Sequence, residues 1–320
     1  GAKLPAGEKR KWYQDMYPAL IAYHQWLYAE RDPHQEGLVL LIHPWESGLD
    51  NSPPWIDQLH LHSKPTWIHL IEGLKLDKLA RLFRRDTRHV PPGQRVSNID
   101  ALLYLSITQR MKRKNWDIER ILARSHFSLQ DATFNCILIR ANAHLRDIAG
   151  YIRRKLPLEL DEAMKRSEDA LDKLWDGSQQ CYFSRAFISH KLVAEPSIGT
   201  LLPLYSGAIT KERAGELVAL MRDAKQFGTD FPVPSVPVSS SWYKELGYWQ
   251  GPTWINTNWL IIDGLERYGF TKEAAELREK TIQLVTPHGP YEYFSAKTGQ
   301  PAGAKNFSWS AALALDLIRR

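Results

Sequence analysis

The sequence predicts an all-α fold in which helices form a toroid and the loops between them gather at one end into a cleft. Apolar residues recur at spacings of three and four along much of the chain, which is typical of amphipathic helices. The alternation of apolar and polar residues that indicates strands is nearly absent. Long stretches rich in Pro, Gly and Ser separate the helical segments, and long loops in a compact domain are usually functional.

The expected helices follow one another along the whole chain. The first covers 12–30 and the second 66–84, each with apolar residues on one face. The third covers 97–111 and opens with a capping pattern of Ser97 and Asp100. Further helices are expected over 131–149, 158–174, 211–223, 252–268, 272–285 and 309–319.

The loops between these helices fall into short links and long segments. None of the long segments resembles a domain linker, so we expect residues 1–320 to form a single helical domain. At 43% hydrophobic residues, the chain has enough apolar surface for a large core. The long loops are expected over 33–58, 85–96, 176–200, 227–247 and 287–307.

Composition and charge restrict the classes of function. Cys136 and Cys181 are the two cysteines, too few for a disulfide framework and without metal-site spacing, so we expect no metal and no cofactor. No apolar run reaches the roughly 18–20 residues needed to cross a bilayer, and no secretory signal is evident, so a cytoplasmic protein without membrane contact is expected. A net charge of +6 with scattered basic residues argues against a nucleic-acid partner, and the oligomeric state is not specified.

The segment HPWESGLDNSPPW, 43–55, holds the first candidate carboxylate. Asp50 precedes Asn51 and two further turn-forming residues, a sequence suited to an Asx turn that would fix the direction of the carboxylate. Asp50 is therefore either a turn cap or a functional group. Glu46 is expected to hydrogen-bond backbone groups and stiffen the loop.

Two later segments are also rich in aromatic residues. In GYWQGPTWINTNWL, Tyr248, Trp249 and Gln250 are expected at the mouth of a helix whose first turn holds Pro252, where they could offer stacking rings and an amide to a sugar. Burial in the core is the alternative for a tryptophan there. Glu292 lies in a loop between two tyrosines, which can desolvate or orient a carboxylate.

Taken together, these segments resemble the family of inverting α-glycosidases that contains processing α-glucosidases and the mannosylglycerate and glucosylglycerate hydrolases. The resemblance is closest to the last two and runs almost from end to end. It rests on RDPHQEGLVLLIHPWESGLDNSPPW, HFSLQDATFNCILIRANAHL, GYWQGPTWINTNWLIIDGLERYGF, YEYFSAKTG and NFSWSAALALDL.

This resemblance implies an (α/α)6 toroid and the hydrolysis of a small α-glycoside, such as glucosylglycerate or mannosylglycerate. The aspartate of the family's WESGxDN motif is its general acid, here Asp50, and the glutamate of its YEYxxxxTG motif is its general base, here Glu292. It also implies that the sugar pocket is lined by Trp45, Tyr248, Trp249 and Trp254, with Gln250 as a hydroxyl contact.

Two features depart from the family pattern. Relatives often have Arg after the Tyr-Trp pair, where this chain has Gln250, so Arg84, Arg85 or Arg88 could instead hold a charged aglycone. The acid loop begins at residue 43, after room for one helix, whereas several helices precede it in the family. The toroid is therefore expected to be incomplete at the N-terminus, without the upstream helices.

Three other functions remain open at this point. Trehalases share the toroid and the inverting pair, so trehalose or another glucoside is an alternative substrate. A non-catalytic helical scaffold for a macromolecule and a sugar-binding module without turnover are the others. A scaffold that binds nucleic acid would lose affinity steeply with salt and would not respond to sugars.

Overall fold

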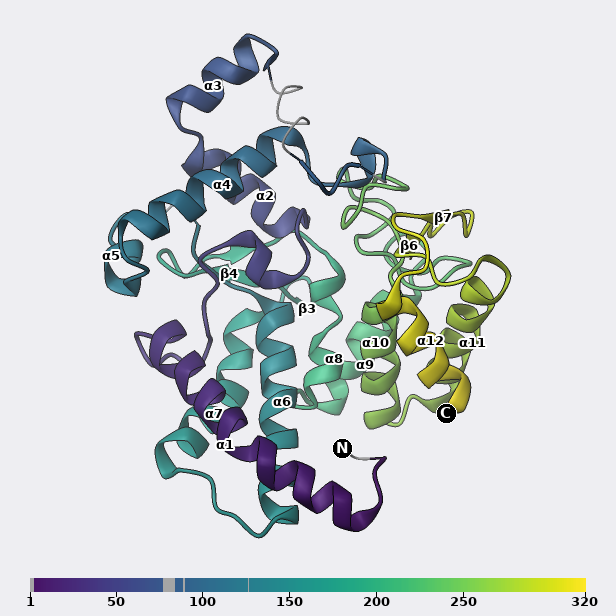
Figure 1. Cartoon of the computed structure of the whole chain (residues 1–320). Coiled ribbons are helices and arrows are strands. Elements are labelled where there is room, and N and C mark those ends of the chain that lie inside the picture. Colours follow the sequence, from purple (N-terminus) through teal and green to yellow (C-terminus); the bar gives the residue numbers. More distant parts are fainter. Residues whose placement is uncertain (1–2, 77–83, 89, 126) are drawn as a thin grey trace.

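The computed structural model describes residues 3–76, 84–88, 90–125 and 127–320. It is mostly helical, as the apolar spacing predicts (Figure 1). Short 3-10 turns cover Pro44–Ser47, Pro92–Gln94, Leu171–Leu174 and Ile198–Thr200. The α-helices are α1 (Ala6–Arg31), α2 (Pro53–Ser63), α3 (Thr66–Gly73), α4 (Asn98–Arg113), α5 (Ile118–Leu122), α6 (Ala132–Tyr151), α7 (Leu158–Ala170), α8 (Pro203–Ser206), α9 (Lys211–Arg222), α10 (Ile255–Arg267), α11 (Thr271–His288) and α12 (Ser308–Arg319).

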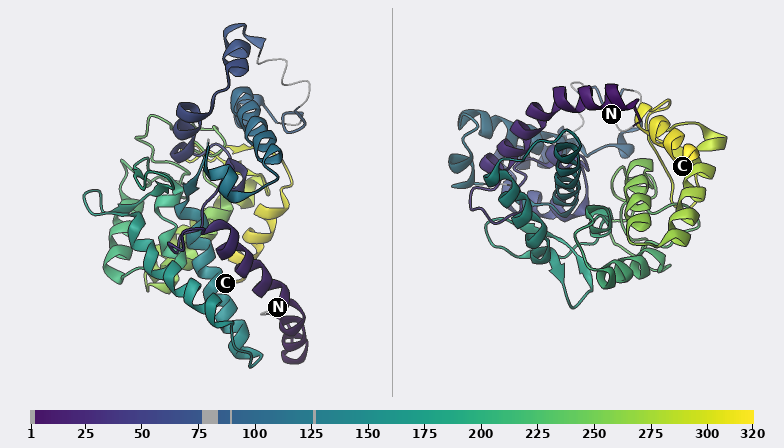
Figure 2. Two further views of the ribbon diagram at one scale, coloured as in Figure 1. Left: turned by 90° about the vertical axis from the view of Figure 1, so that its left-hand side faces the viewer. Right: turned by 90° about the horizontal axis from the view of Figure 1, so that it is seen from below.

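The helices are arranged as a ring around inner helices. α6 packs against α8, α8 packs against α10, and α10 packs against both α11 and α12. α1 and α7 cover the outer side of α6. Seen from below, along the axes of the inner helices, the elements form a ring (Figure 2, right). This arrangement confirms the predicted toroid class.

The strands are two or three residues long and form small antiparallel sheets. β1 (Leu129–Gln130), β4 (Ser184–Ala186) and β5 (Leu192–Val193) form one antiparallel sheet. β2 (Trp175–Asp176) pairs with β3 (Cys181–Tyr182), and β6 (Tyr293–Phe294) pairs with β7 (Pro301–Ala302). These ribbons brace the loops. The β6–β7 ribbon matters most for function because it begins directly after Glu292.

Most of the long loops meet at one end of the ring, as predicted. In Figure 1 the loop before α2, the segment before α4, the loop before α10 and the β6–β7 ribbon all lie above α6, α8 and α10. Among the described residues, the largest cluster of buried apolar side chains joins these loops to the helices and includes residues from Leu38 to Leu317. Cys136 and Cys181 are buried in that cluster as free thiols. The helices therefore form a rigid base for the loops.

Several predicted boundaries are wrong, and the first helix begins at Ala6 instead of at 12. The helix expected over 66–84 ends at Gly73, and Lys75 adopts φ +53°, which a continuing helix cannot accommodate; residues 77–83 lie outside the described residues. The loop expected over 33–58 contains the start of α2, where Pro53 and Pro54 occupy the first helical turn and need no backbone donors. The helix expected from 252 begins at Ile255.

The cap predicted for α4 is confirmed. The hydroxyl Oγ of Ser97 accepts a hydrogen bond from the backbone N–H of Asp100 at 3.0 Å and donates to its carboxylate at 2.6 Å. Helix α4 therefore starts at a defined residue, and its first turns form one wall of the cleft described below. Across the part of the chain that the structure describes, no helix combines the length and apolar character that crossing a membrane requires.

Candidate active site

The loop before Asp50 is held in one shape by Glu46, as the sequence predicts. One carboxylate oxygen of Glu46, Oε2, accepts hydrogen bonds from the backbone N–H groups of Ile42 at 2.8 Å and His43 at 3.3 Å. The other, Oε1, binds the guanidinium of Arg31 at 2.6 Å, at the end of α1. This pairing anchors the acid loop to the outer layer of helices.

Two tyrosines from distant elements hold Asp50. The phenol of Tyr248 donates to Oδ2 of Asp50 at 3.1 Å, and the phenol of Tyr104 in α4 donates to its backbone carbonyl. The predicted Asx turn is wrong, because the hydrogen bond of the carboxylate goes to Tyr248 instead of to the backbone that follows. Asp50 therefore points across the cleft toward the segment before α10.

Asn51, which the sequence indicates only as a turn residue, fastens the two segments together. Its amide Nδ2 donates to the carbonyl of Gly247 at 3.0 Å, and its Oδ1 accepts from the backbone N–H of Trp249 at 2.8 Å. The side-chain amide of Gln250 donates to the carbonyl of Asn51 at 3.0 Å. All three bonds are buried, so the acid loop and residues 247–250 form one unit.

Tyr248 lies in a turn over 247–250 that is followed by an extended stretch, instead of in the first turn of a helix. Tyr248 itself has φ +66°, and α10 starts only at Ile255. Pro252 therefore lies outside the helix. The reason is that Thr253 exchanges two backbone hydrogen bonds with Phe294, at 2.8 and 3.0 Å, which keep this stretch extended.

Trp249 and Trp254 form a stacked pair next to Tyr248. Their ring centroids are 3.8 Å apart with an interplanar angle of 4°, and the side chains are 1% and 2% exposed. The ring of Tyr248 lies 5.5 Å from that of Trp254. Neither tryptophan lines the cavity around Asp50. The structure thus places them where they support Tyr248, and their contact with a sugar stays a prediction.

Glu292 is buried beside the β6–β7 ribbon, with 6% of its surface exposed. Its Oε2 accepts a hydrogen bond from the backbone N–H of Ala304 at 2.8 Å and binds the guanidinium of Arg95 at 2.6 Å. Gly303 has φ +73°, and a Cβ atom at this position would lie 2.6 Å from the same oxygen. Only glycine leaves room for the carboxylate in this orientation.

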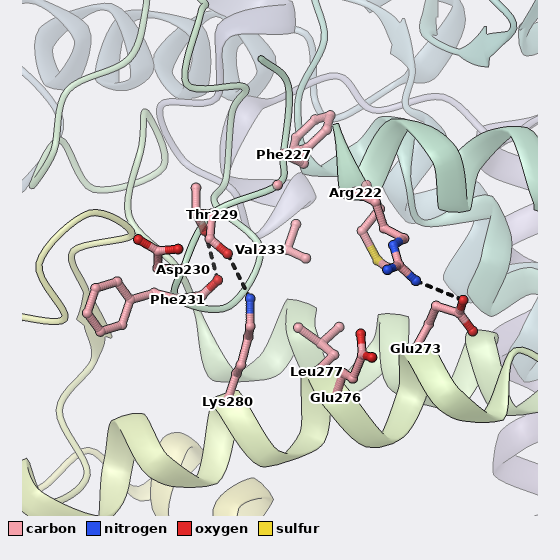
Figure 3. Close-up of a pocket in the computed structure, with 12 residues that line it drawn as sticks. Arg222, Phe227, Thr229, Asp230, Phe231, Val233, Glu273, Glu276, Leu277 and Lys280 are labelled. Atoms are coloured by element: carbon pink, nitrogen blue, oxygen red, sulfur yellow. Dashed lines mark hydrogen bonds and ion pairs between the residues drawn. The ribbon is translucent and has the colours of Figure 1, made fainter. Parts of the chain in front are cut away.

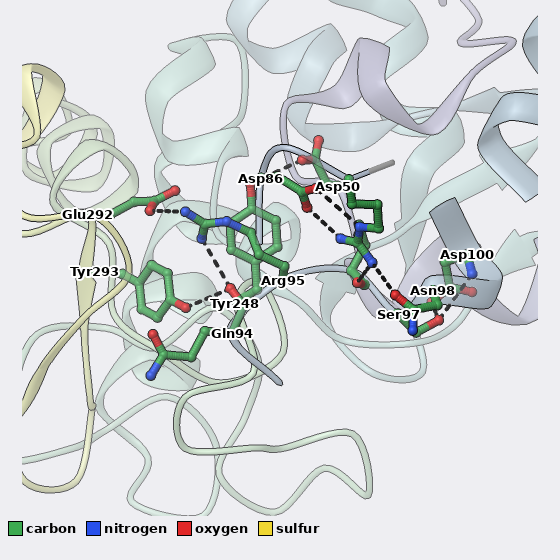
Figure 4. Close-up of polar contacts among 12 residues, drawn as sticks. Asp50, Asp86, Gln94, Arg95, Ser97, Asn98, Asp100, Tyr248, Glu292 and Tyr293 are labelled. Carbon is green, nitrogen blue, oxygen red and sulfur yellow. Dashed lines mark hydrogen bonds and ion pairs between the residues drawn. The ribbon is translucent and has the colours of Figure 1, made fainter. Parts of the chain in front are cut away.

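Arg95 is a residue of the site that sequence reasoning missed. Its guanidinium lies 5.0 Å from the ring centroid of Tyr248, within cation–π distance. Figure 4 shows it between Tyr248 and Glu292, with Asp50 on the far side. Contacts therefore run without a break from Asp50 through Tyr248 and Arg95 to Glu292. A single arginine after a variable loop gives no local sequence signal of this role.

The pKa of Asp50 is raised, mainly because burial disfavours its charged form. The hydrogen bond from Tyr248 and the charge of Arg95 act in the opposite direction, and the carboxylates of Glu292 and Asp86 raise the pKa further. Burial also raises the pKa of Tyr248, so the phenol keeps its proton and remains a donor. The protonated form that a general acid needs is thereby favoured at Asp50.

Asp50 and Glu292 line the same cavity, which has a volume of about 650 Å³. Trp45 lies at its side with 55% of its surface exposed, an accessible face for a sugar ring. Its ring packs edge-on against that of Tyr104, with 5.8 Å between centroids. The other lining residues are Arg84, Arg85, Asp86, Arg95, Val96, Ala101, Leu102, Leu105 and Tyr248.

The arginines proposed to hold a charged aglycone differ in their surroundings. Arg84 is bound to Asp86 and donates to the carbonyl of Val96 at 2.9 Å, so its guanidinium is engaged. Arg85 lines the cavity and is exposed. Arg88 is exposed and does not line this cavity.

Gln250 lines a second cavity of about 760 Å³ instead of the first. Its Oε1 accepts a hydrogen bond from Lys244 at 3.0 Å, while its amide nitrogen binds Asn51, so both ends have partners. The two cavities share Arg95 and Val96 as a dividing wall. The predicted contact of Gln250 with a sugar hydroxyl stays a prediction.

A third cavity, of about 280 Å³, lies between α9 and α11 (Figure 3). Its charged side chains are mostly paired: Arg222 binds Glu273 at 3.0 Å, and Lys280 donates to the carbonyl of Thr229 at 2.8 Å. It shares no lining residue with the cavity around Asp50. Among the residues that the structure describes, no group of three or more His, Cys, Asp or Glu side chains is placed to hold a metal ion.

Comparison with known proteins gives consistent matches over almost the whole chain. The family described as the mannosylglycerate hydrolase MGH1-like glycoside hydrolase domain matches residues 3–310. A mannosylglycerate hydrolase from Thermus thermophilus is 37% identical over 95% of this chain and 70% of its own length. A glucosylglycerate hydrolase from Mycolicibacterium hassiacum is 27% identical over 93% of this chain and 66% of its own length. The crystal structure of a GH63 mannosylglycerate hydrolase from Thermus thermophilus, in complex with Tris and D-glycerate, superposes with a TM-score of 0.86 at 35% identity, covering 97% of this chain and 72% of that one.

Proposed function

This chain belongs to the mannosylglycerate hydrolase MGH1-like family of glycoside hydrolases, and on that premise we propose that it hydrolyses the α-glycosidic bond of a small glycoside with inversion. Asp50 is the general acid and Glu292 the general base. The observation that carries this proposal is that both carboxyl groups line one cavity and are linked through Tyr248 and Arg95.

The reaction needs opposite protonation states at the two groups. Asp50 gives its proton to the glycosidic oxygen as the bond to the anomeric carbon breaks. Glu292 takes a proton from a water molecule that attacks the same carbon from the opposite face, so the configuration inverts. Inverting enzymes hold the two carboxyl groups about 6.5–9.5 Å apart to leave room for that water. The raised pKa of Asp50 supports the assignment of the acid.

A sugar linked to glycerate is the proposed substrate class. The relatives are named as mannosylglycerate and glucosylglycerate hydrolases, and glycerate carries a carboxylate. Arg85 lines the same cavity as the acid and base and is the exposed cation there, whereas Arg84 is already held by Asp86. Arg85 is therefore the proposed partner of the aglycone carboxylate. Trp45 and Tyr248 are the proposed stacking residues.

The test is hydrolysis by the purified chain of glucosylglycerate, mannosylglycerate, trehalose and kojibiose, with the anomer of the released sugar followed by NMR. We expect the β-anomer from an α-glycerate glycoside. In D50N and E292Q, kcat should fall by roughly 10²–10⁴, the usual contribution of a general acid or base. D169N and E159Q, at exposed positions, are the matched controls and should retain activity.

Other outcomes separate the alternatives. Preferential cleavage of trehalose would replace the proposed substrate by that of a trehalase-like enzyme. Binding of a glycoside without release of sugar would indicate a binding module, and release of the α-anomer would contradict inversion. Activity retained in D50N or E292Q would contradict the assigned acid or base.

A cytoplasmic location and a single domain over residues 1–320 also remain proposals. Fractionation of cells that express the native protein would test the location. The single domain is supported by the buried apolar cluster that runs from Leu38 to Leu317, and an unfolding experiment can test it directly.

A further inference from the structure

We propose that Arg95 is a positioning residue that fixes one oxygen of Glu292 and leaves the other free to receive a proton from water. The inference rests on the proposed function, because it assigns to Arg95 a role in the work of the base. It starts from the two oxygens of Glu292. Oε2 has two donors, the guanidinium of Arg95 and the backbone N–H of Ala304, whereas Oε1 has no hydrogen-bond partner within the described part of the chain.

The contact between Arg95 and Glu292 is shielded from solvent. The two side chains are 11% and 7% exposed, and the nitrogen and oxygen are 2.6 Å apart. A charge-assisted hydrogen bond in such surroundings is strong, and removal of one partner leaves the other charge buried and unpaired. Arg95 thus restricts how the carboxylate of Glu292 can rotate.

Arg95 is itself fixed to the ribbon that carries Glu292. Its Nη1 donates to the carbonyl of Gln94 at 3.1 Å, and the phenol of Tyr293 donates to the same carbonyl at 2.9 Å. The side-chain oxygen of Gln94 accepts from the backbone N–H of Gly303 at 3.0 Å. Arg95 and Glu292 are therefore held by the same set of hydrogen bonds around the β6–β7 ribbon, so their relative positions are fixed.

The same guanidinium also touches the acid side of the cleft. It lies over the ring of Tyr248, whose phenol donates to Asp50. Arg95 also lines both large cavities, so it lies next to the acid and the base at the boundary between the two cavities. A change at Arg95 should therefore affect the chemical step more than substrate affinity.

The test compares the wild type with R95A, R95K and the control R120A, whose arginine is 68% exposed. In R95A we expect kcat to fall by about 10², as a misplacement of roughly 1 Å can cause. KM should change by less than about threefold, since an interaction that acts in the transition state lowers kcat and kcat/KM together. Added guanidinium ion should restore kcat of R95A in a saturable way, and R95K should retain part of it. R120A should behave as the wild type does.

A second readout does not depend on turnover. The side-chain carboxyl ¹³C resonance of Glu292, assigned by its absence in E292Q, should shift in R95A and return when guanidinium ion is added. Circular dichroism verifies that the variants are folded. A kcat loss matched by a rise in KM, or no response to guanidinium ion, would overturn the inference. An unchanged Glu292 resonance in R95A would overturn it as well. If the wild type cleaves no glycoside but its Glu292 resonance still responds to R95A and guanidinium ion, only the proposed function is overturned.

Discussion

Asp50 and Glu292 are both carboxylates in one cavity, yet their surroundings give them different chemistry. Asp50 is held by a neutral phenol, and burial raises its pKa. Glu292 is held by a guanidinium and a backbone N–H, both of which stabilise a carboxylate. The donors therefore differ: Asp50 has a neutral phenol, whereas Glu292 has a guanidinium together with a backbone N–H.

The raised pKa of Asp50 has a consequence for stability. Asp50 has an ordinary pKa of 3.8, and folding raises this pKa. As the pH rises from 3.8 through the pKa of the folded state, such a group makes the fold less stable. D50N, which cannot ionise, should therefore be more stable than the wild type at pH 7. The advantage should vanish below about pH 4, where both chains are uncharged at this position.

Thermal unfolding at several pH values measures this effect. The gain in stability appears as a rise in Tm, at roughly 2–4 °C for each kcal/mol in large domains. D169N, at an exposed aspartate, should show no such pH-dependent difference. A D50N variant that is less stable than the wild type at pH 7 would contradict the argument.

At the level of single residues, the sequence indicates the candidate catalytic carboxylates better than it indicates the residues that hold them in place. Asp50, Glu292 and Glu46 lie in motifs that predict their roles, and the part played by Glu46 is confirmed. Asn51 and Arg95 were missed because their partners lie far away in the sequence. Local pattern cannot show a contact between residues nearly 200 positions apart.

Among the elements, the acid loop and the turn 247–250 depend on one another through Asn51. In N51A the carbonyl of Gly247 and the backbone N–H of Trp249 would lose their partners inside the protein. Each unsatisfied buried group costs about 1–3 kcal/mol, so for the two groups we expect a total loss of roughly 2–6 kcal/mol. We also expect kcat to fall by at least about tenfold, since Asp50 and Tyr248 would no longer be held in register.

Denaturant unfolding and steady-state kinetics of the same preparation test this prediction. Q14A, at an exposed position of α1, provides the control for loss of a side-chain amide. If the stability of N51A lies within about 0.5 kcal/mol of the wild type, the range of ordinary surface substitutions, the hydrogen bonds of the Asn51 side chain do not stabilise the fold.

Elements with strong apolar spacing were predicted well, and those with extended or proline-rich ends were not. α6, α9, α11 and α12 lie within a few residues of their predicted ranges. The starts of α2 and α10 were misjudged for a physical reason. Pro53 and Pro54 read as a loop but begin α2, and Pro252 reads as a helix start although backbone pairing of Thr253 with Phe294 keeps it extended.

At the scale of the whole molecule, the largest apolar cluster of the described residues has a thermodynamic consequence. The largest cluster of buried side chains joins residues from Leu38 to Leu317. Helices on both sides of the ring share it, so neither half can lose its packing alone. We expect tryptophan fluorescence and far-ultraviolet circular dichroism to report one coincident unfolding transition. Two separated transitions would show that the chain contains more than one cooperative unit.

The fold class and the family were within reach of the sequence, because long motifs occur in a fixed order along almost the whole chain. The matched family and the superposed crystal structure confirm both. The extent of the toroid is a different matter. The chain spans 70% and 68% of the lengths of two mannosylglycerate hydrolases that it matches. The expectation that upstream helices are missing remains untested.

The hydrogen bonds of Asn51 also have a consequence for the time course of folding. They join residues that are 196, 198 and 199 positions apart. Contacts of such long range form slowly, because the chain must first give up the entropy of closing a very large loop. Helical signal should therefore return early during refolding and enzymatic activity late, so that nascent chains pass through a helical but inactive stage.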